Sequence, residues 1–198
     1  LIAVSGGTGV GINAMLSKAL GEKDHETVKK TANHAVFLVG VAYIIFLIAG
    51  VFLAETLIQS QGGMGLALTY GTQYLRIVYI GAGAVLTQVT FERLLQSTGR
   101  TFYSMIAQMT GAIINIILDP IFIFGYFGMP EMKVAGAALA TVIGQVCATV
   151  VAVLLNHFKN KEIQIDLRKF RPEWKIIKRI YAVGLPSMVM QSIGSVMN

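Results

Sequence analysis

The fold is decided by residues 101–127, which read TFYSMIAQMTGAIINIILDPIFIFGYF. A helix that crosses the hydrocarbon core of a bilayer needs about 20 mostly apolar residues. This stretch exceeds that length and carries a single charge, Asp119. Two further stretches, residues 31–54 and 134–158, carry no charge at all. The sequence therefore predicts three membrane-spanning helices.

The composition of the whole chain agrees with a membrane protein. The 198 residues are 55% hydrophobic and 13% charged, with a net charge of +6 and a mean hydropathy of +0.66. Soluble domains average about 25% charged residues, so lipid is the expected solvent of this surface. A single cysteine, Cys147, excludes a disulfide framework and a cysteine-based zinc site. Because no Ser/His/Asp or Cys/His arrangement is visible, the sequence gives no support for an enzyme.

A fourth span is predicted over residues 66–97. Its charges, Arg76 near the start and Glu92 and Arg93 near the end, are expected to reach the two interfaces by snorkelling. Residues 1–17 and 180–198 are also apolar, but each is shorter than a span. We therefore expect an all-α, polytopic transmembrane bundle with four complete spans and two partial ones, which is a fragment of a longer protein.

The basic residues are concentrated in alternate loops between these spans. Loops 18–30, 93–100 and 159–179 hold 14 of the 16 lysines and arginines, and by the positive-inside rule these loops are cytoplasmic. The loop 159–179 has eight basic and three acidic residues. Such a loop can bind nucleic acid or anionic lipid. We favour a loop that sets topology in the inner or plasma membrane, with the lipid bilayer as its partner and no nucleic acid.

Polar residues form a stripe on each of three predicted helices. The first stripe is Thr101, Ser104, Gln108, Gly111, Asn115 and Asp119, whose spacings of three and four place them on one helix face. The second is Thr141, Gln145 and Thr149, and the third is Tyr74, Gly81, Gln88, Glu92 and Gln96. The stripes together favour a shared water-accessible cavity, lined by Gln88, Gln108, Gly111 and Gln145. For any one residue, the alternative is a hydrogen bond between packed helices.

Asp119 is the leading candidate for a functional residue. In a helix over 101–127 it lies about 27 Å from the inner end and about 12 Å from the outer end. A carboxylate at such depth costs at least ~2.5–3.5 kcal/mol, so it either takes up a proton or binds a cation such as Na⁺. Asn115 lies one turn earlier, and Pro120 is predicted to act as a hinge. The alternative is a carboxylate that caps a broken helix.

Three local patterns are given structural interpretations. The run Gly6–Gly11 lacks the Lys-Ser/Thr of a nucleotide-binding loop, and Gly7 and Gly11 predict a close contact between helices. Asp24 is predicted to cap a short cytoplasmic helix that begins near His25. The histidines have no cysteine or carboxylate partner at metal-ligand spacing, so no metal site is expected apart from Na⁺ at Asp119.

Several stretches resemble the multidrug and toxic compound extrusion (MATE) transporters, in their bacterial drug/cation antiporter branch. They are residues 16–21 (LSKALG), 74–77 (YLRI), 95–101 (LQSTGRT), 115–125 (NIILDPIFIFG) and 136–141 (GAALAT). The resemblance covers essentially the whole chain. It implies a twelve-helix fold in two six-helix lobes. Residues 1–158 would run from late helix two through helix six of the first lobe. Residues 159–179 would be the connector, and residues 180–198 the start of helix seven in the second lobe.

The same resemblance implies a cation site in the first lobe. Its helix-five Asn and Asp match Asn115 and Asp119, while Tyr74 and Thr141 match supporting groups, and an Asp of helix one lies before Leu1. The implied activity is secondary-active efflux of cationic or amphipathic drugs against H⁺ or Na⁺, by alternating access and without a cofactor. The remaining second lobe would be a required partner. The alternatives are a flippase for lipid-linked precursors, disfavoured because the stripes carry no Lys or Arg, and a non-transporting membrane scaffold.

Overall fold

The computed structural model of the chain describes residues 2–60, 65–125, 132–163, 165 and 171–196. Within these residues the chain forms helices and no strand. The helices are α1 (Ile2–Gly21), α2 (His25–Ser60), α3 (Leu66–Ile80), α4 (Ala82–Ser97), α5 (Thr101–Phe124), α6 (Lys133–Lys159) and α7 (Trp174–Val196). The predicted all-α class is confirmed.

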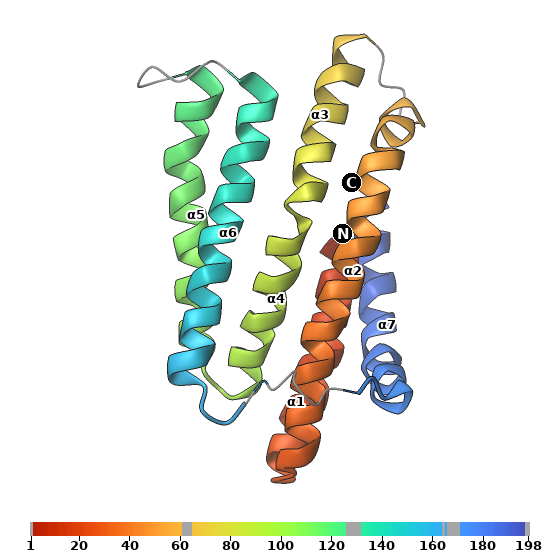
Figure 1. Cartoon of the computed structure of the whole chain (residues 1–198), viewed down its shortest axis with the longest axis vertical. Coiled ribbons are helices and arrows are strands. Elements are labelled where there is room, and N and C mark those ends of the chain that lie inside the picture. The colour runs from red at the N-terminus through yellow and green to blue at the C-terminus, as the bar shows by residue number, and fades with distance from the viewer. Residues whose placement is uncertain (1, 61–64, 126–131, 164, 166–170, 197–198) are drawn as a thin grey trace.

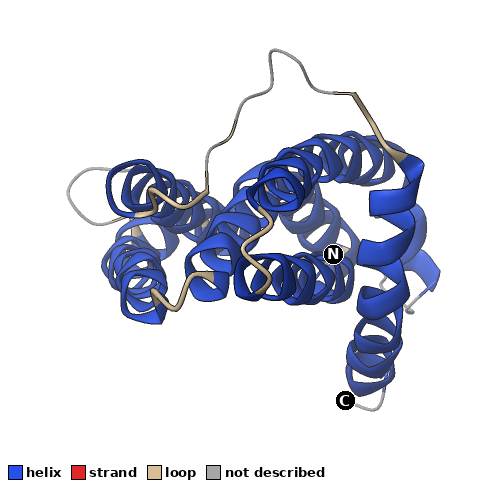
Figure 2. Cartoon of the chain, turned by 90° about the horizontal axis from the view of Figure 1, so that it is seen from below, coloured by secondary structure: helices blue, strands red, loops and turns tan. Residues whose placement is uncertain are grey.

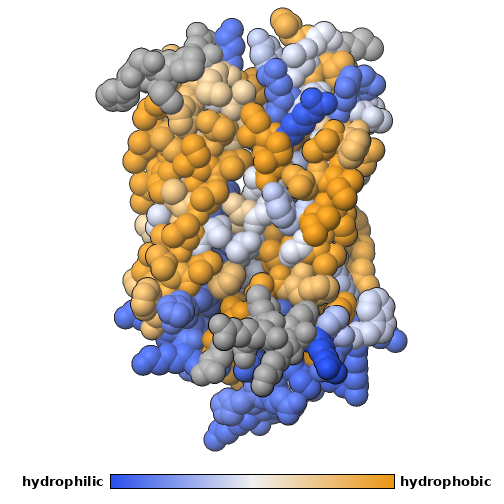
Figure 3. All heavy atoms as spheres, viewed as in Figure 1, coloured by the Kyte–Doolittle hydropathy of each residue, from blue (hydrophilic) through white to orange (hydrophobic). Residues whose placement is uncertain are grey.

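Three helices, α2, α5 and α6, are long and apolar enough to cross a bilayer, and α3 and α4 qualify together as one bent span. Their outward-facing side chains are large and apolar: Phe52, Phe102 and Ile116 are 75%, 69% and 70% exposed. Figure 3 shows apolar atoms over most of the middle of the visible face and hydrophilic residues at its lower end. Such a surface is solvated by lipid rather than by water, so the predicted transmembrane bundle is confirmed.

The span predicted over residues 66–97 is broken into two helices. α3 and α4 meet at Gly81 with a bend of 46°. A side chain at Gly81 would collide with Val142 of α6, so the glycine lets the bend approach its neighbour closely. The Tyr43 hydroxyl of α2 donates to the Ile80 carbonyl at 3.2 Å, which satisfies a backbone acceptor at the bend. Hydrophobic length indicates a span, but it does not reveal a break that depends on contacts with other helices.

The helices form one bundle in which α4 is central. It contacts α1, α2, α3, α5 and α6. α5 and α6 pack against each other on one side of α4, and α1, α2 and α7 lie on the other side (Figure 1). Figure 2 looks along the bundle from below and shows the C-terminal end of the chain at its edge. This arrangement brings the polar stripes of α4, α5 and α6 together.

The three basic loops lie at one end of the bundle. The last residues of α1, α4 and α6 and the first residues of α2, α5 and α7, which flank these loops, are all at the lower end in Figure 1. The His34 ring of α2 helps to hold the last connection, because its Nε2 accepts a hydrogen bond from the Glu173 backbone N–H at 2.8 Å. Lys30 pairs with the Glu173 carboxylate at 3.1 Å. Loops that share an end of the bundle share a side of the membrane, as the charge pattern predicts.

α1 and α7 meet through glycines, as the spacing of Gly7 and Gly11 predicts. A side chain on Gly7 would collide with Met188 and with the Gly184 carbonyl, and one on Gly11 with the Ile180 carbonyl. The three partners in α7 are four residues apart, so they lie on one face of that helix. The Gly6–Gly11 run is therefore a packing surface within α1.

The start of α2 and the end of α5 differ from expectation. His25 begins a single helix that continues to Ser60, so there is no separate cytoplasmic helix. Asp24 does cap it: its carboxylate accepts hydrogen bonds from the Thr27 backbone N–H at 3.1 Å and from the Thr27 hydroxyl at 2.6 Å. α5 ends at Phe124, earlier than predicted, because Gly125 adopts a left-handed conformation with φ of 71°.

Candidate cation site and polar cavity

Asp119, Asn115 and Thr141 form one cluster where α5 meets α6. Asn115 lies one turn before Asp119, so both face the same way, and α6 brings Thr141 alongside. Asn115 Nδ2 donates to Asp119 Oδ1 and to Thr141 Oγ1, both at 3.4 Å. With the amide turned over, Nδ2 donates to Asp119 Oδ2 at 3.2 Å and Oδ1 accepts from the Thr141 backbone N–H at 3.2 Å. Asn115 therefore links the two helices in either orientation.

The backbones of α5 and α6 approach closely because two glycines face each other. A Cβ atom on Gly144 would lie 2.8 Å from the Gly111 carbonyl oxygen and 3.3 Å from Asn115 Cβ. A Cβ on Gly111 would lie 2.9 Å from Ala148 Cβ. Small residues at such positions let helices come together in a membrane. This close approach places Thr141 within reach of Asn115.

A cavity of about 250 Å³ lies beside this cluster. Its lining consists of Gln88, Gln108, Gly111, Ala112, Asn115, Thr141 and Gln145. All four residues predicted to line a shared cavity are present in this set. The lining also contains two members of the predicted cation site, and it includes no lysine or arginine. The polar stripes thus converge on one space, although what that space binds stays a prediction.

Three predicted site residues are outside the cavity lining: Asp119, which adjoins it through Asn115, and Tyr74 and Pro120. Tyr74 is half-buried on α3, beyond the bend, and among the described residues its hydroxyl has no hydrogen-bond partner. Pro120 lies inside α5, which continues through it to Phe124. A supporting role for Tyr74 and a hinge at Pro120 therefore remain predictions.

Glu92 lies on the polar face of α4 with Gln88, as the third stripe predicts, but its exposure was predicted wrongly. Its carboxylate was expected to snorkel to the interface, but the residue is only 5% exposed and lies between α4 and α5. Gln88 Nε2 donates to Glu92 Oε1 at 2.7 Å, and Gln108 Nε2 donates to Oε2 at 2.8 Å. The four-residue spacing from Gln88 to Glu92 places both side chains on one face of α4, but it does not show that this face is covered by α5.

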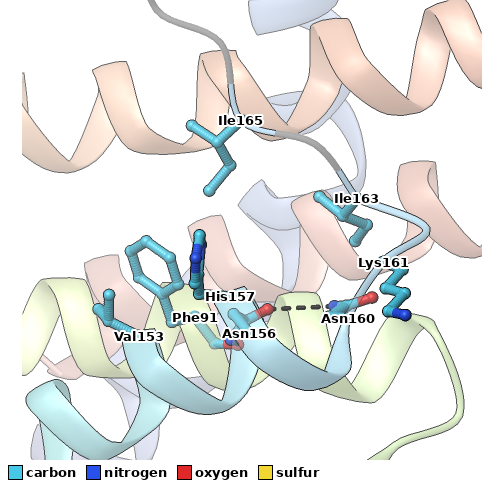
Figure 4. Close-up of a pocket in the computed structure, with 8 residues that line it drawn as sticks. All are labelled: Phe91, Val153, Asn156, His157, Asn160, Lys161, Ile163 and Ile165. Atoms are coloured by element: carbon cyan, nitrogen blue, oxygen red, sulfur yellow. Dashed lines mark hydrogen bonds between the residues drawn. The ribbon is translucent and has the colours of Figure 1, made fainter.

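A second hollow of about 540 Å³ lies at the end of α6 nearest the basic loops. Figure 4 shows Asn156 and Asn160 joined by a hydrogen bond there, with Phe91 and Val153 toward one side and Lys161 toward the other. Asn156 donates to the Phe91 carbonyl at 2.8 Å, and Asn160 donates to the Leu94 carbonyl at 3.1 Å. These asparagines fasten α6 to α4. They continue the α6 stripe, although the sequence reasoning ended that stripe at Thr149.

The donor atoms at Asp119 suit a proton or a hard cation. Carboxylate, amide and hydroxyl oxygens are the ligands that small hard cations prefer. In the part of the chain that the structure describes, there is no group of three or more His, Cys, Asp or Glu placed to hold a metal. The cluster therefore offers one carboxylate with neutral oxygens around it, a set suited to a proton or a monovalent ion.

Comparison with known proteins places this geometry in a family. Residues 1–121 match the family model described as MatE. The chain is 29% identical over 182 residues to the multidrug export protein MepA of Staphylococcus saprophyticus, and 27% identical over 183 residues to MepA of Staphylococcus aureus. Each alignment covers 92% of this chain and 40% of the relative. The chain thus spans well under half the length of these curated relatives.

Solved structures give the same result. One is described as the outward-facing conformation of a multidrug resistance MATE family transporter of the MOP superfamily. It matches with a TM-score of 0.91 and 30% identity, over 98% of this chain and 43% of the solved chain. Another is described as the inward-facing conformation of such a transporter. It matches with a TM-score of 0.89 and 30% identity, over 96% and 42% of the two chains.

Proposed function

Since this chain belongs to the MatE family, we propose that it is part of a secondary-active multidrug exporter rather than an enzyme. The observation that carries the proposal is the Asp119–Asn115–Thr141 cluster beside a polar cavity inside a membrane bundle. A carboxylate within the hydrocarbon core is energetically costly, so carboxylates found there usually face a cavity or a partner and mark a functional site. The proposed activity is export of cationic or amphipathic compounds in exchange for H⁺ or Na⁺.

The two solved conformations support a mechanism in which this part of the transporter moves as a unit. The chain matches the outward-facing and inward-facing structures almost equally well, with TM-scores of 0.91 and 0.89. A segment that bent strongly between the two states would fit one much better than the other. Alternating access would then come from rigid movement of this lobe against the second lobe, joined through the basic connector 159–179.

Coupling requires that the ion bind the two conformations with different affinity. A ligand that binds both states equally shifts nothing, and a shift from 1:99 to 99:1 needs about 5.5 kcal/mol of difference. Protonation or Na⁺ binding changes the charge of Asp119 and competes for the oxygens that Asn115 and Thr141 share. Binding at this cluster therefore changes the local contact between α5 and α6, and Pro120 is the proposed hinge for a small bend near the end of α5 that leaves the rest of the lobe rigid.

The cavity disfavours lipid-linked phosphates, and the carboxylate of Asp119 beside it is the group that suits a cationic compound. Its described lining holds amides, a hydroxyl and glycine, and it has no basic residue to pair with a phosphate. A flippase for lipid-linked precursors would need such residues. The setting is a cell membrane, with loops 18–30, 93–100 and 159–179 on its cytoplasmic side.

The test uses the intact transporter that contains this chain, reconstituted in vesicles. Asp119→Asn keeps the shape of the side chain but removes its charge, so we expect efflux of a cationic dye to be abolished while dye binding stays measurable. H⁺ and Na⁺ gradients are imposed separately to identify the coupling ion. Glu55→Gln is the matched control, because Glu55 is an exposed carboxylate at the far end of α2. Wild-type efflux by the Asp119 variant would overturn the proposal.

A further inference from the structure

Glu92 is a buried acid for which the proposed mechanism has no role. It is 5% exposed, and its two oxygens accept hydrogen bonds from Gln88 at 2.7 Å and Gln108 at 2.8 Å. Both donors are neutral amides. A buried carboxylate is normally paired with a cation, because leaving it charged and unpaired is costly. Glu92 therefore needs a positive partner that the described side chains do not supply.

The charged groups near α4 have other partners. Arg93, next along α4, donates to Gln96 at 2.7 Å. Lys18 of α1 pairs with Glu22 at 3.8 Å, and Lys30 of α2 pairs with Glu26 and Glu173 at 2.9 and 3.1 Å.

The other helices that pack against α4 also place no cationic side chain at Glu92. α5 carries no basic residue, and its one charge is the carboxylate of Asp119. His157 of α6 is exposed and packs its ring against Phe158, and Arg76 of α3 is exposed beyond the bend. Within the described residues no ion pair reaches the Glu92 carboxylate, so a proton is the simplest positive charge to neutralise it.

Gln88 provides an independent indication of a missing donor. It is 7% exposed and lines the cavity, yet its Oε1 atom is buried with no hydrogen-bond partner. If Glu92 is protonated and the Gln88 amide turns over, Oε1 accepts from the new carboxyl O–H and Nε2 becomes the atom without a partner. Nε2 then takes the buried position that Oε1 held. The pair has a hydrogen-bonded arrangement for the charged form of Glu92 and another for the neutral form.

The position of Glu92 links this pair to both the cytoplasmic end and the Asp119 cluster. Glu92 lies five residues before the end of α4, which is about 8 Å along the helix axis. Its partners Gln88 and Gln108 line the same cavity as Asn115 and Thr141. Gln108 and Asp119 are about 16 Å apart along α5, and the cavity of about 250 Å³ has room for several waters.

We propose that Glu92, with Gln88 and Gln108, is a second proton-binding site of this lobe, which passes protons between the cytoplasm and the cavity. In the inward step the ionised Glu92 carboxylate takes a proton from a hydronium ion in the cavity and leaves water there, and the Glu92 carboxyl then gives that proton to water at the cytoplasmic end and returns to the ionised form held by the two amides. The return step reverses this. No bond other than the O–H bond is made or broken. The inference rests on the proposed function for its role in transport, but not for the existence of the site.

The site itself is tested by infrared difference spectroscopy of the intact transporter in lipid, across a pH titration. We expect a carboxylic-acid C=O band that appears as the pH falls, is missing in Glu92→Gln, and remains in Asp119→Asn and Glu55→Gln. If the band assigned to Glu92 is missing in wild type across the titration, or is unchanged in Glu92→Gln, the proposal is wrong. Because this readout needs no drug, it stands even if the proposed transport function fails.

The role of the site is tested by proton flux. With a pH-sensitive dye inside vesicles, we expect Glu92→Gln to slow drug-driven proton movement by roughly tenfold or more, while Glu55→Gln moves protons as wild type does. Drug binding and the thermal unfolding temperature of Glu92→Gln show whether the protein is folded. If it is unstable, Gln88→Leu is the second variant, because it removes the switching amide and leaves the acid. Wild-type flux in folded Glu92→Gln would exclude a relay role while leaving the Asp119 proposal intact.

Discussion

Asp119 and Glu92 are two carboxylates in one bundle, but their surroundings differ. Glu92 is 5% exposed and accepts two short hydrogen bonds, at 2.7 and 2.8 Å, from separate amides. Asp119 is half-buried, and its partner Asn115 divides one amide between Asp119 and Thr141 at 3.4 Å. Weakly held oxygens beside a cavity can accept an incoming ion, whereas a carboxylate enclosed by two donors can accept little more than a proton.

Both residues are carboxylic acids, so the difference between ion binding at Asp119 and proton binding at Glu92 comes from how the helices pack around each of them. Glu92 lies between α4 and α5, on the side of the bundle nearest the basic loops, while Asp119 lies where two glycines bring α5 and α6 together. Changes at the α5–α6 contact should therefore disturb Asp119 and leave Glu92 in place. The predictions below use this separation.

The largest effect is expected from Gly144→Val. Its side chain would press on the Gly111 carbonyl and on Asn115, forcing α5 and α6 apart. Overpacking of this kind costs typically about 1–3 kcal/mol of stability. It also removes Thr141 from the reach of Asn115. We expect a lower unfolding temperature and loss of ion-dependent efflux, while the infrared band of Glu92 is unchanged.

The matched control for this change is Gly40→Val. Gly40 lies on α2, and a Cβ atom there meets nothing within 4 Å. It should leave transport unchanged and should not lower the unfolding temperature appreciably. If Gly144→Val moved the Glu92 band as much as it disturbed Asp119, the two carboxylates would not be separable.

A smaller effect is expected from Asn115→Leu. This change removes the amide that touches both Asp119 and Thr141 but keeps the bulk of the side chain. Loss of a group that orients a ligand typically weakens ion binding by about 10–100-fold. The concentration of coupling ion that gives half-maximal efflux should rise by that factor. Thr110→Val is the control, because the Thr110 hydroxyl donates only to the Ile106 carbonyl of its own helix. An unchanged ion dependence in Asn115→Leu would remove Asn115 from the site.

Much of this site could be predicted from the sequence because helical periodicity fixes which residues share a face. The spacings of three and four residues from Gln108 through Gly111 and Asn115 to Asp119 were sufficient to place them beside one another. Periodicity within one helix does not say how far a neighbouring helix is shifted or rotated. For that reason the burial of Glu92 and the bend at Gly81 were both missed.

The same limit explains the asparagines at the end of α6. Asn156 and Asn160 bond to backbone carbonyls of α4, and nothing in the α6 sequence marks those acceptors. From sequence alone, a polar residue near a predicted membrane boundary is expected to be exposed to water. Contacts between helices decide instead whether it is buried.

The smallest effect is expected at a third carboxylate, Asp24, which caps α2 outside the membrane. Hydrogen bonds from the Thr27 hydroxyl, and then from the Thr27 backbone N–H, lower the pKa of Asp24 below its ordinary value of 3.8. Because the folded pKa is lower than the unfolded one, the cap stabilises the protein fully above the ordinary pKa. That contribution is lost as the pH falls through the lowered value. Asp24→Ala should therefore reduce the unfolding temperature slightly at pH 7, and by progressively less as the pH falls below 3.8.

Asp24→Asn separates the cap from the charge, since asparagine also caps helices well. It should retain most of the stability at pH 7 and lose the pH dependence. Asp24 accepts two hydrogen bonds, as Glu92 does, at 2.6 and 3.1 Å, yet it is exposed to water, which screens its charge. If Asp24→Ala impaired efflux as strongly as Asp119→Asn, then accepting hydrogen bonds would be enough to make a carboxylate important for transport, whatever its burial. An effect confined to stability would show that burial beside a cavity is what distinguishes Asp119 and Glu92.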